Sequence, residues 1–173
     1  MSVQENPDEV FTVMWKSGHS VWIPSDSKSC GIRAICVLSN GQVLLADMEN
    51  KKVKLLNQQY KVVSHCNVTA GPHGICQITP REVAVTVDDD INTHEVQFIT
   101  VTKSMLVTER QFRLEHKCRG IAHHADDLFI GAGSALYMYS LSGELCTRLY
   151  KQLNRRLTTY RQLKVGNMLV TGR

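Results

Sequence analysis

The residues with the clearest potential for metal chemistry form the run Asp88–Glu95 (DDDINTHE). Its D-x-D-x-N spacing resembles the first ligand positions of a calcium-binding loop, in which carboxylate and amide oxygens surround the ion. Such a loop also needs glycine at its sixth position and glutamate at its twelfth, where this chain has Thr93 and Ile99. We therefore interpret the run as a solvated hairpin loop.

A second set of potential ligands lies in twelve residues: His65, Cys66, His73 and Cys76. Imidazole and thiolate groups are the ligands that zinc prefers. However, the spacing matches no zinc module, and Cys76 falls in an apolar segment that reads as a strand. The sequence does not support a zinc site here.

The adjacent pair His123 and His124, close to Asp126, is the third candidate. Adjacent residues of a strand point to opposite faces, so the two imidazoles cannot easily share one ion. We expect a strand end with one buried and one exposed histidine. No Ser-His-Asp or Cys-His pairing can be assigned, because the candidate residues are scattered. The sequence therefore predicts no enzyme, no catalytic residue, no metal and no cofactor.

The elements that must position these side chains recur along the chain. A short apolar run follows a polar or turn residue at Val43, Val83, Leu128 and Met168, at spacings of 40, 45 and 40 residues. Another apolar segment precedes each of these anchors, and two more follow each of the first three. Four short strands per unit without helices predict an all-β fold, a β-propeller of four-stranded antiparallel blades.

The individual strands can be placed within each unit. Small residues at Ala34, Gly74 and Gly120 stand just ahead of or at the start of the innermost strand, where backbones crowd around the propeller axis. The predicted first strands are 34–38, 74–78 and 120–122, the third strands are 53–56, 95–101 and 135–140, and the fourth strands are 61–68, 106–114 and 144–149.

The two ends of the chain predict incomplete blades, which gives about three full blades and two half blades. Segments 9–15 and 19–25 read as a third and a fourth strand, and segment 160–172 reads as a first and a second strand. Residues 1–8 are polar and acidic and are predicted to be a disordered tail before a propeller domain at 9–173. The chain is then either an open arc of a larger propeller or a four-bladed ring whose ends share one blade, which would remove unpaired edges.

Segment 34–56 (AICVLSNGQVLLADMENKKVKLL) resembles an NHL repeat, and the chain is similar to the C-terminal propeller of invertebrate tripartite-motif proteins. This resemblance implies a recognition module, because propellers of that family bind proteins and some bind RNA on an electropositive face. It would make the chain the substrate-recognition part of a tripartite-motif-like ubiquitin ligase that lacks the RING and B-box modules. It also implies that Asp47 and Asn50 form a structural turn.

Basic residues gather in two kinds of loop that a propeller presents on one face. These are the corners between second and third strands and the links from a fourth strand to the next first strand. We predict this face as the contact surface for a protein partner, with single-stranded RNA as the alternative, although Asp88–Asp90 would oppose an anion there. The predicted partner-binding residues are Lys51, Lys52, His73, Lys117, Arg119, Arg155 and Arg156.

The bulk composition, 43% hydrophobic and 21% charged, is that of a soluble globular protein. The net charge of +4 falls short of the clustered basicity of a dedicated nucleic-acid binder. The apolar stretch 10–23 is interrupted by Lys16, Gly18 and His19, so neither a signal peptide nor a membrane span is predicted and we expect a cytoplasmic protein. The six cysteines are scattered singly and are expected to be reduced thiols. No small-molecule substrate and no membrane partner are predicted.

Overall fold

The computed structural model describes residues 18–151, 163–165 and 168–170, and within them every regular element is a β-strand. In that part of the chain there is accordingly no helix of the length and hydropathy that crossing a membrane requires. The strands are β1 (Ile32–Val37), β2 (Val43–Asp47), β3 (Lys52–Leu56), β4 (Val62–Asn67), β5 (Gly71–Thr79), β6 (Glu82–Asp88), β7 (His94–Val101), β8 (Leu106–Arg113), β9 (Gly120–His124), β10 (Asp127–Ala132), β11 (Ala135–Ser140), β12 (Leu145–Lys151), β13 (Leu163–Val165) and β14 (Met168–Val170).

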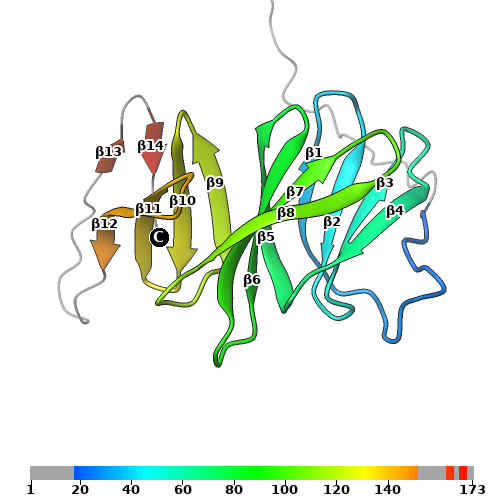
Figure 1. Cartoon of the computed structure of the whole chain (residues 1–173), viewed down its shortest axis with the longest axis horizontal. Coiled ribbons are helices and arrows are strands. Elements are labelled where there is room, and N and C mark those ends of the chain that lie inside the picture. Colours follow the sequence, from blue (N-terminus) through cyan, green and yellow to red (C-terminus); the bar gives the residue numbers. More distant parts are fainter. Residues whose placement is uncertain (1–17, 152–162, 166–167, 171–173) are drawn as a thin grey trace, which may run out of the picture.

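The strands form three four-stranded antiparallel sheets in chain order, β1–β4, β5–β8 and β9–β12, followed by the two-stranded sheet β13–β14. Figure 1 shows the three large sheets side by side along the molecule. Their first strands contact one another, since β1 lies against β5 and β5 lies against β9. First strands on the inside and fourth strands on the outside define the blades of a β-propeller, so the predicted fold and its three complete blades are confirmed.

The ends of the chain agree with the prediction only in part. The predicted strand at 19–25 is wrong, because residues 18–31 form no strand. The reason is a turn: the Asp26 amide donates to the Ile23 carbonyl at 2.9 Å, and the Asp26 carboxylate accepts the Ile23 amide at 3.0 Å. The predicted strand at 9–15 and the predicted tail at 1–8 lie outside the described residues. In segment 160–172, β13 and β14 pair as predicted for a first and a second strand.

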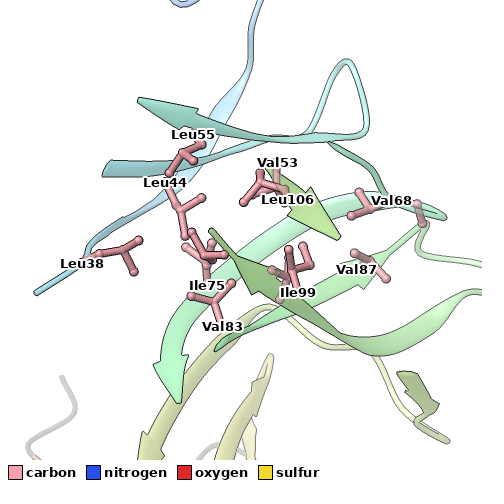
Figure 2. Packing of buried hydrophobic residues seen from close by; sticks show 13 residues of the cluster. Leu38, Leu44, Val53, Leu55, Val68, Ile75, Val83, Val87, Ile99 and Leu106 are labelled. Atoms are coloured by element: carbon pink, nitrogen blue, oxygen red, sulfur yellow. The ribbon is translucent and has the colours of Figure 1, made fainter. Parts of the chain in front are cut away.

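The hydrophobic core lies between the blades. Figure 2 shows the cluster between the first two blades, in which Leu44, Val53 and Leu55 of the first meet Ile75 and other apolar side chains of the second. A second cluster, which includes Phe98, Leu128 and Ile130, joins the second blade to the third. Each large side chain that is buried in this way contributes roughly 1.5–3 kcal/mol of transfer free energy. The middle blade is therefore covered on both faces.

The inner strands approach closely at Gly74. A Cβ atom at this position would lie 2.7 Å from the Arg119 carbonyl oxygen and 3.0 Å from the Ile121 amide nitrogen, so only glycine fits. Gly120 has nothing within 4 Å of the equivalent point. The expected close approach therefore occurs at Gly74 but does not require glycine at position 120.

Candidate functional site on the loop face

The corners between second and third strands lie beside the links that lead to the next first strand. After the first blade, the Val68 amide donates to the Lys51 carbonyl at 3.0 Å. After the second blade, the Cys118 amide donates to the Asp88 carboxylate at 2.7 Å. These two kinds of loop therefore share one face of the arc, which we call the loop face.

The link between β8 and β9 is held on two blades at once. The Arg119 amide donates to the Gly131 carbonyl of the third blade at 2.8 Å, and the Arg119 carbonyl accepts the Thr86 hydroxyl of the second blade at 2.9 Å. Cys118 beside it is fully buried, and burial raises the pKa of its thiol to about 12. The backbone under the Arg119 side chain is consequently fixed.

Charged side chains on this link converge on Asp90. The Lys117 ammonium lies 3.0 Å from the Asp90 carboxylate, and the Arg119 guanidinium donates to the same oxygen. The hydrogen bonds from Lys117 and Arg119 hold the pKa of Asp90 below its usual range. The Arg119 guanidinium also lies 3.1 Å from the His73 ring. Burial, followed by the charge of Arg119, lowers the pKa of His73, which favours the neutral ring.

A cavity of about 370 Å³ opens next to this cluster, between the β8–β9 link and the third blade. The His116 ring stacks on Tyr137 with 3.6 Å between centroids, and the Arg148 guanidinium lies 5.0 Å from the centre of the same tyrosine ring. We call this cavity the basic–aromatic pocket. Its lining residues are His116, Lys117, Arg119, Ala132, Gly133, Ser134, Ala135, Tyr137 and Arg148.

His116 is neutral and oriented by two hydrogen bonds. Its Nδ1 atom lies 2.9 Å from the Lys117 carbonyl, which can only accept, so Nδ1 carries the proton. Its Nε2 atom accepts the Tyr139 hydroxyl at 2.7 Å. Burial lowers the pKa of His116 and so favours this uncharged form. The positive charge of the pocket therefore comes from Lys117, Arg119 and Arg148.

The structure brings together three of the residues that the sequence predicted for partner binding, His73, Lys117 and Arg119. Lys51 is exposed at the β2–β3 corner of the same face. Lys52 is only 7% exposed, and its ammonium donates to the Ser25 carbonyl at 2.9 Å, so it is not part of the exposed surface. Arg155 and Arg156 lie outside the described residues.

Sequence reasoning missed His116, Tyr137 and Arg148, which are far apart in the chain. One signal was present, since Leu136–Tyr139 alternates as a half-buried strand does and places Tyr137 and Tyr139 on one face. That alternation could have marked an aromatic face. It could not have shown that a histidine from the preceding link would stack on it.

The sequence candidates for metal binding have other partners. The Asp89 carboxylate accepts the amides of Ile91, Asn92 and Thr93 at 2.8–3.0 Å, and these hydrogen bonds hold its pKa well below the usual range. The Asp88 carboxylate accepts the Cys118 amide and lies 3.0 Å from His94. The acidic run is therefore an internally bonded hairpin loop.

The His and Cys candidates occupy separate places. His65 contacts the Ser25 hydroxyl at 3.3 Å, while His73 contacts Arg119 on the loop face. Burial raises the pKa of Cys66 to about 11 and that of Cys76 to about 12, so both thiols are protonated at neutral pH. In the β9 strand, His124 is exposed, as expected, whereas His123 is half-buried rather than buried.

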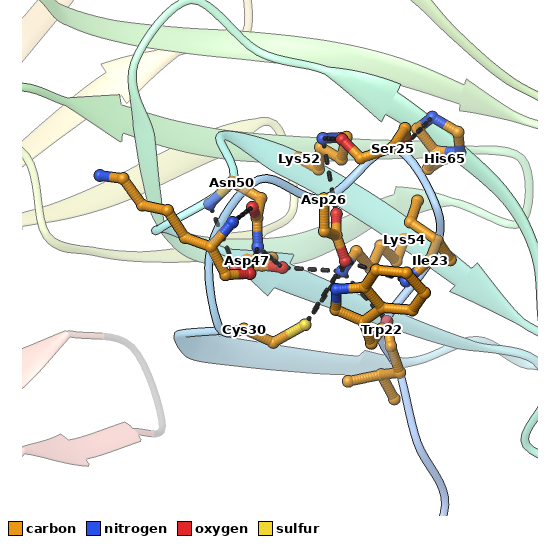
Figure 3. A network of polar contacts seen from close by, with 12 residues as sticks. Trp22, Ile23, Ser25, Asp26, Cys30, Asp47, Asn50, Lys52, Lys54 and His65 are labelled. Carbon is orange, nitrogen blue, oxygen red and sulfur yellow. Dashed lines mark hydrogen bonds and ion pairs between the residues drawn. The ribbon is translucent and has the colours of Figure 1, made fainter.

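A buried ionic network lies on the outer face of the first blade (Figure 3). The Lys54 ammonium is fully buried, contacts the carboxylates of Asp26 at 2.5 Å and Asp47 at 2.7 Å, and donates to the Val21 carbonyl at 3.0 Å. The Asn50 side-chain amide donates to Asp47 at 2.9 Å, so the structural turn expected at 47–50 is present. The network fastens segment 21–30 to the blade.

Within the part of the chain that the structure describes, the ligand atoms of Asp26, Cys30 and Asp47 form the one group close enough to share a metal ion. The Lys54 ammonium contacts all three and lies 3.2 Å from the Cys30 sulfur. It already supplies the positive charge that an ion would bring. We therefore assign this group to the stability of the fold.

The electrostatics of this network follow from its contacts. Burial alone would raise the pKa of Asp26 and Asp47. The hydrogen bonds from Lys54, helped by the Ile23 amide at Asp26 and by Asn50 and the Gly31 amide at Asp47, outweigh it and hold both pKa values below their usual range. Burial alone would lower the pKa of Lys54, but its bonds to the two carboxylates raise it. All three groups are charged at neutral pH.

Comparisons with known proteins support the fold. Neither a family model nor a curated protein matches the chain. Among solved structures it is similar to the Cps50 (Swd1) β-propeller domain of Myceliophteria thermophila (TM-score 0.56, 14% identity, 68% of this chain and 40% of that one). It is also similar to virginiamycin B lyase of Staphylococcus aureus (TM-score 0.57, 14% identity, 75% of this chain and 44% of that one).

A functionally unknown protein from Desulfotomaculum acetoxidans gives a TM-score of 0.59 at 15% identity, over 68% of this chain and 42% of that one. Identities this low show the β-propeller fold alone. The chain spans less than half the length of each of these three proteins.

Proposed function

We propose that this chain is a non-enzymatic recognition module whose loop face binds an acidic segment of a protein partner. The observation that carries the proposal is the basic–aromatic pocket, where Lys117, Arg119 and Arg148 line one cavity beside Tyr137. Arginine side chains and aromatic rings supply much of the binding energy of protein interfaces, and guanidinium groups bind carboxylates with two parallel hydrogen bonds. The resemblance to tripartite-motif proteins implies that such a face selects the substrate of a ubiquitin ligase.

The geometry suits an extended acidic peptide. The Arg119 backbone is held on two blades, so its side chain is presented from a fixed base. A ligand carboxylate that reaches the pocket competes with Asp90 for Lys117 and Arg119. Arg148 is exposed and takes part in none of the ion pairs among the described residues; its guanidinium lies over the Tyr137 ring. We expect Arg148 to make the first contact with the partner.

The test is fluorescence anisotropy with a fluorescein-labelled oligo-glutamate peptide as the probe. Replacing Arg148→Gln should weaken binding about tenfold, since a charge-assisted hydrogen bond contributes about 1.5–3 kcal/mol. Arg81→Gln is the matched control, because Arg81 is exposed at the β5–β6 turn on the opposite face. Equal effects of the two substitutions would show that only the net charge of the chain matters. The basic–aromatic pocket would then be rejected as the binding site.

One observation favours single-stranded RNA as the second candidate. The His116–Tyr137 stack beside three cations is the arrangement on which nucleic-acid bases stack while their phosphates are neutralised. A labelled uridine oligonucleotide in the same assay tests it, because its affinity must fall steeply with salt. Tight RNA binding without peptide binding would replace the protein proposal, and no RNA binding at low salt would remove the alternative.

A further inference from the structure

The cations that line the basic–aromatic pocket outnumber the carboxylates that contact them. Lys117 and Arg119 of the β8–β9 link share one carboxylate, that of Asp90. Arg148 on β12 lies opposite Tyr137 in the β11–β12 register and is exposed. It takes part in none of the ion pairs among the described residues. The contacts of these side chains therefore leave positive charge at the pocket for a ligand.

A second carboxylate lies beneath the link, but it does not compete with a ligand. Asp88 is only 3% exposed, accepts the Cys118 amide at 2.7 Å and lies 3.0 Å from His94. Its charge lowers the positive potential of the site, yet its oxygens do not reach the surface. Asp90 is exposed and stands at the cations themselves. A ligand therefore has to compete with Asp90.

A phosphate group suits this competition better than a carboxylate does. A ligand carboxylate that takes the place of Asp90 exchanges one singly charged group with two oxygens for another, so it gains mainly the contact with Arg148. A phosphomonoester carries a charge of about −1.5 to −2 at pH 7 and three strong acceptor oxygens on one phosphorus atom. One oxygen can bond Lys117 and Arg119 while another is available to Arg148, because all three line the same cavity.

The rim of the cavity adds neutral donors. Ser134 lines it and is exposed, so its hydroxyl can donate to a ligand. It belongs to the two-residue turn between β10 and β11, in which Ala132 pairs with Ala135 and Gly133 has φ of 59°. A positive φ at the first central residue is typical of a type II′ hairpin turn. The hydroxyl on this turn faces the same cavity as the cations and can bond a phosphate oxygen that they leave free.

We propose that the basic–aromatic pocket binds a phosphorylated side chain of the acidic partner segment. This inference rests on the proposed function, since it names the group of that segment that enters the pocket. Clusters of arginine recognise phosphorylated motifs in the same way in other folds. Asp90 is then an internal competitor that a phosphate dianion displaces more readily than a single carboxylate does. Phosphorylation of the partner therefore switches its binding on.

The first test is fluorescence anisotropy at pH 7.5 with four fluorescein-labelled peptides of glycine and glutamate. They differ only at a central position, which holds serine, glutamate, phosphoserine or two glutamates in tandem. The phosphoserine peptide should bind at least about tenfold more tightly than the single-glutamate peptide. The tandem glutamates carry about the same charge as phosphoserine but on two separate groups, so their peptide should stay within about threefold of the single-glutamate peptide. Equal affinity of the tandem-glutamate and phosphoserine peptides would overturn the proposal.

Substitution of Arg148 assigns the preference to the pocket. Arg148→Gln should reduce the ratio of phosphoserine affinity to glutamate affinity at least about threefold, because the uncompensated cation is gone. Arg81→Gln, on the opposite face, should leave this ratio unchanged. Urea unfolding of both variants verifies that each one folds. An unchanged ratio in Arg148→Gln would overturn the proposal.

Inorganic phosphate as a competitor distinguishes a phosphorylated segment from free phosphate. It should displace the phosphoserine peptide only at about millimolar concentration, because it lacks the flanking residues of the segment. Displacement at micromolar phosphate would assign the pocket to the free ion and overturn the proposal. The two proposals fail differently. If none of the four peptides binds, recognition of an acidic segment fails as well; if the glutamate and phosphoserine peptides bind equally, only the preference for phosphate fails.

Discussion

Asp90 sets how much positive charge the loop face presents. It stands in the β6–β7 corner with φ of 67° and contacts both Lys117 and Arg119. Without its carboxylate, the two cations would be available to a ligand. Asparagine keeps the shape of aspartate and tolerates a positive φ, so the charge can be removed with little strain.

Replacing Asp90→Asn should strengthen binding of the oligo-glutamate probe by roughly threefold to tenfold, because the intramolecular competitor is gone. Fluorescence anisotropy measures the change. Asp126→Asn is the matched control, since Asp126 is exposed in the β9–β10 turn at the other end of the third blade. If both variants gain affinity for the probe equally, the effect is one of net charge, and the contacts of Asp90 with Lys117 and Arg119 have no special role.

The sequence could identify some of the residues on the loop face, but it could not show which of them are exposed and which are buried or bonded to another residue. Lys117 and Arg119 could be predicted from the type of loop alone, because charged side chains in a link between blades are exposed, as these two are, although Cys118 between them is buried. Lys52 could not be judged in this way, since it begins β3 on the face that segment 21–30 covers. The path of that segment depends on the turn at Ile23–Asp26 and on Lys54, both of which are contacts in three dimensions rather than patterns in the sequence.

At the scale of the elements, the sequence repeat correctly predicts the position of the second strand in each sheet. All four anchor residues lie in the second strand of a sheet: Val43, Val83, Leu128 and Met168. Apolar periodicity carries this information because each blade must bury both of its faces. The ends could not be predicted equally well, because the apolar residues at 21–23 have a strand-like composition but are followed by Pro24 and a turn.

Gly74→Ala should destabilise the fold by about 1–3 kcal/mol, the usual cost of overpacking. The added methyl group would meet the Arg119 carbonyl and the Ile121 amide, which are backbone atoms of the neighbouring inner strand and its link. Gly120→Ala is the control, because nothing lies within 4 Å of its Cβ position. Urea unfolding measures both; equal midpoints would contradict the close approach of β5 and β9.

At the scale of the whole molecule, Lys54 ties the segment before the first strand to the body of the arc. Because the pKa values of the Asp26 and Asp47 carboxyls are depressed, the stability that this ionic network contributes depends on pH. In the folded chain Asp26 and Asp47 keep their charge at a pH where the unfolded chain binds protons. The stability that they contribute is present above about pH 4 and is lost as the pH falls through the folded pKa values.

We therefore expect the free energy of unfolding to decrease steadily below about pH 4, as measured by urea titrations at several pH values. Lys54→Met should cost about 3–5 kcal/mol at neutral pH, since it leaves two buried carboxylates without their cation. In that variant the two carboxylates lose the hydrogen bonds and the charge of Lys54, so their pKa values rise and stability should fall less over the same acid range. A parallel fall in both proteins would assign the acid response to other groups.

The double anchoring of Arg119 has a consequence for how such a face evolves. Its backbone joins two blades through hydrogen bonds to Thr86 and Gly131, while its side chain lies on the loop face in contact with Asp90 and His73. Selection can thus exchange the side chains at positions 117, 119 and 148 without disturbing the backbone hydrogen bonds between the blades. Descendant genes could acquire new binding preferences by substitution alone and keep the same architecture.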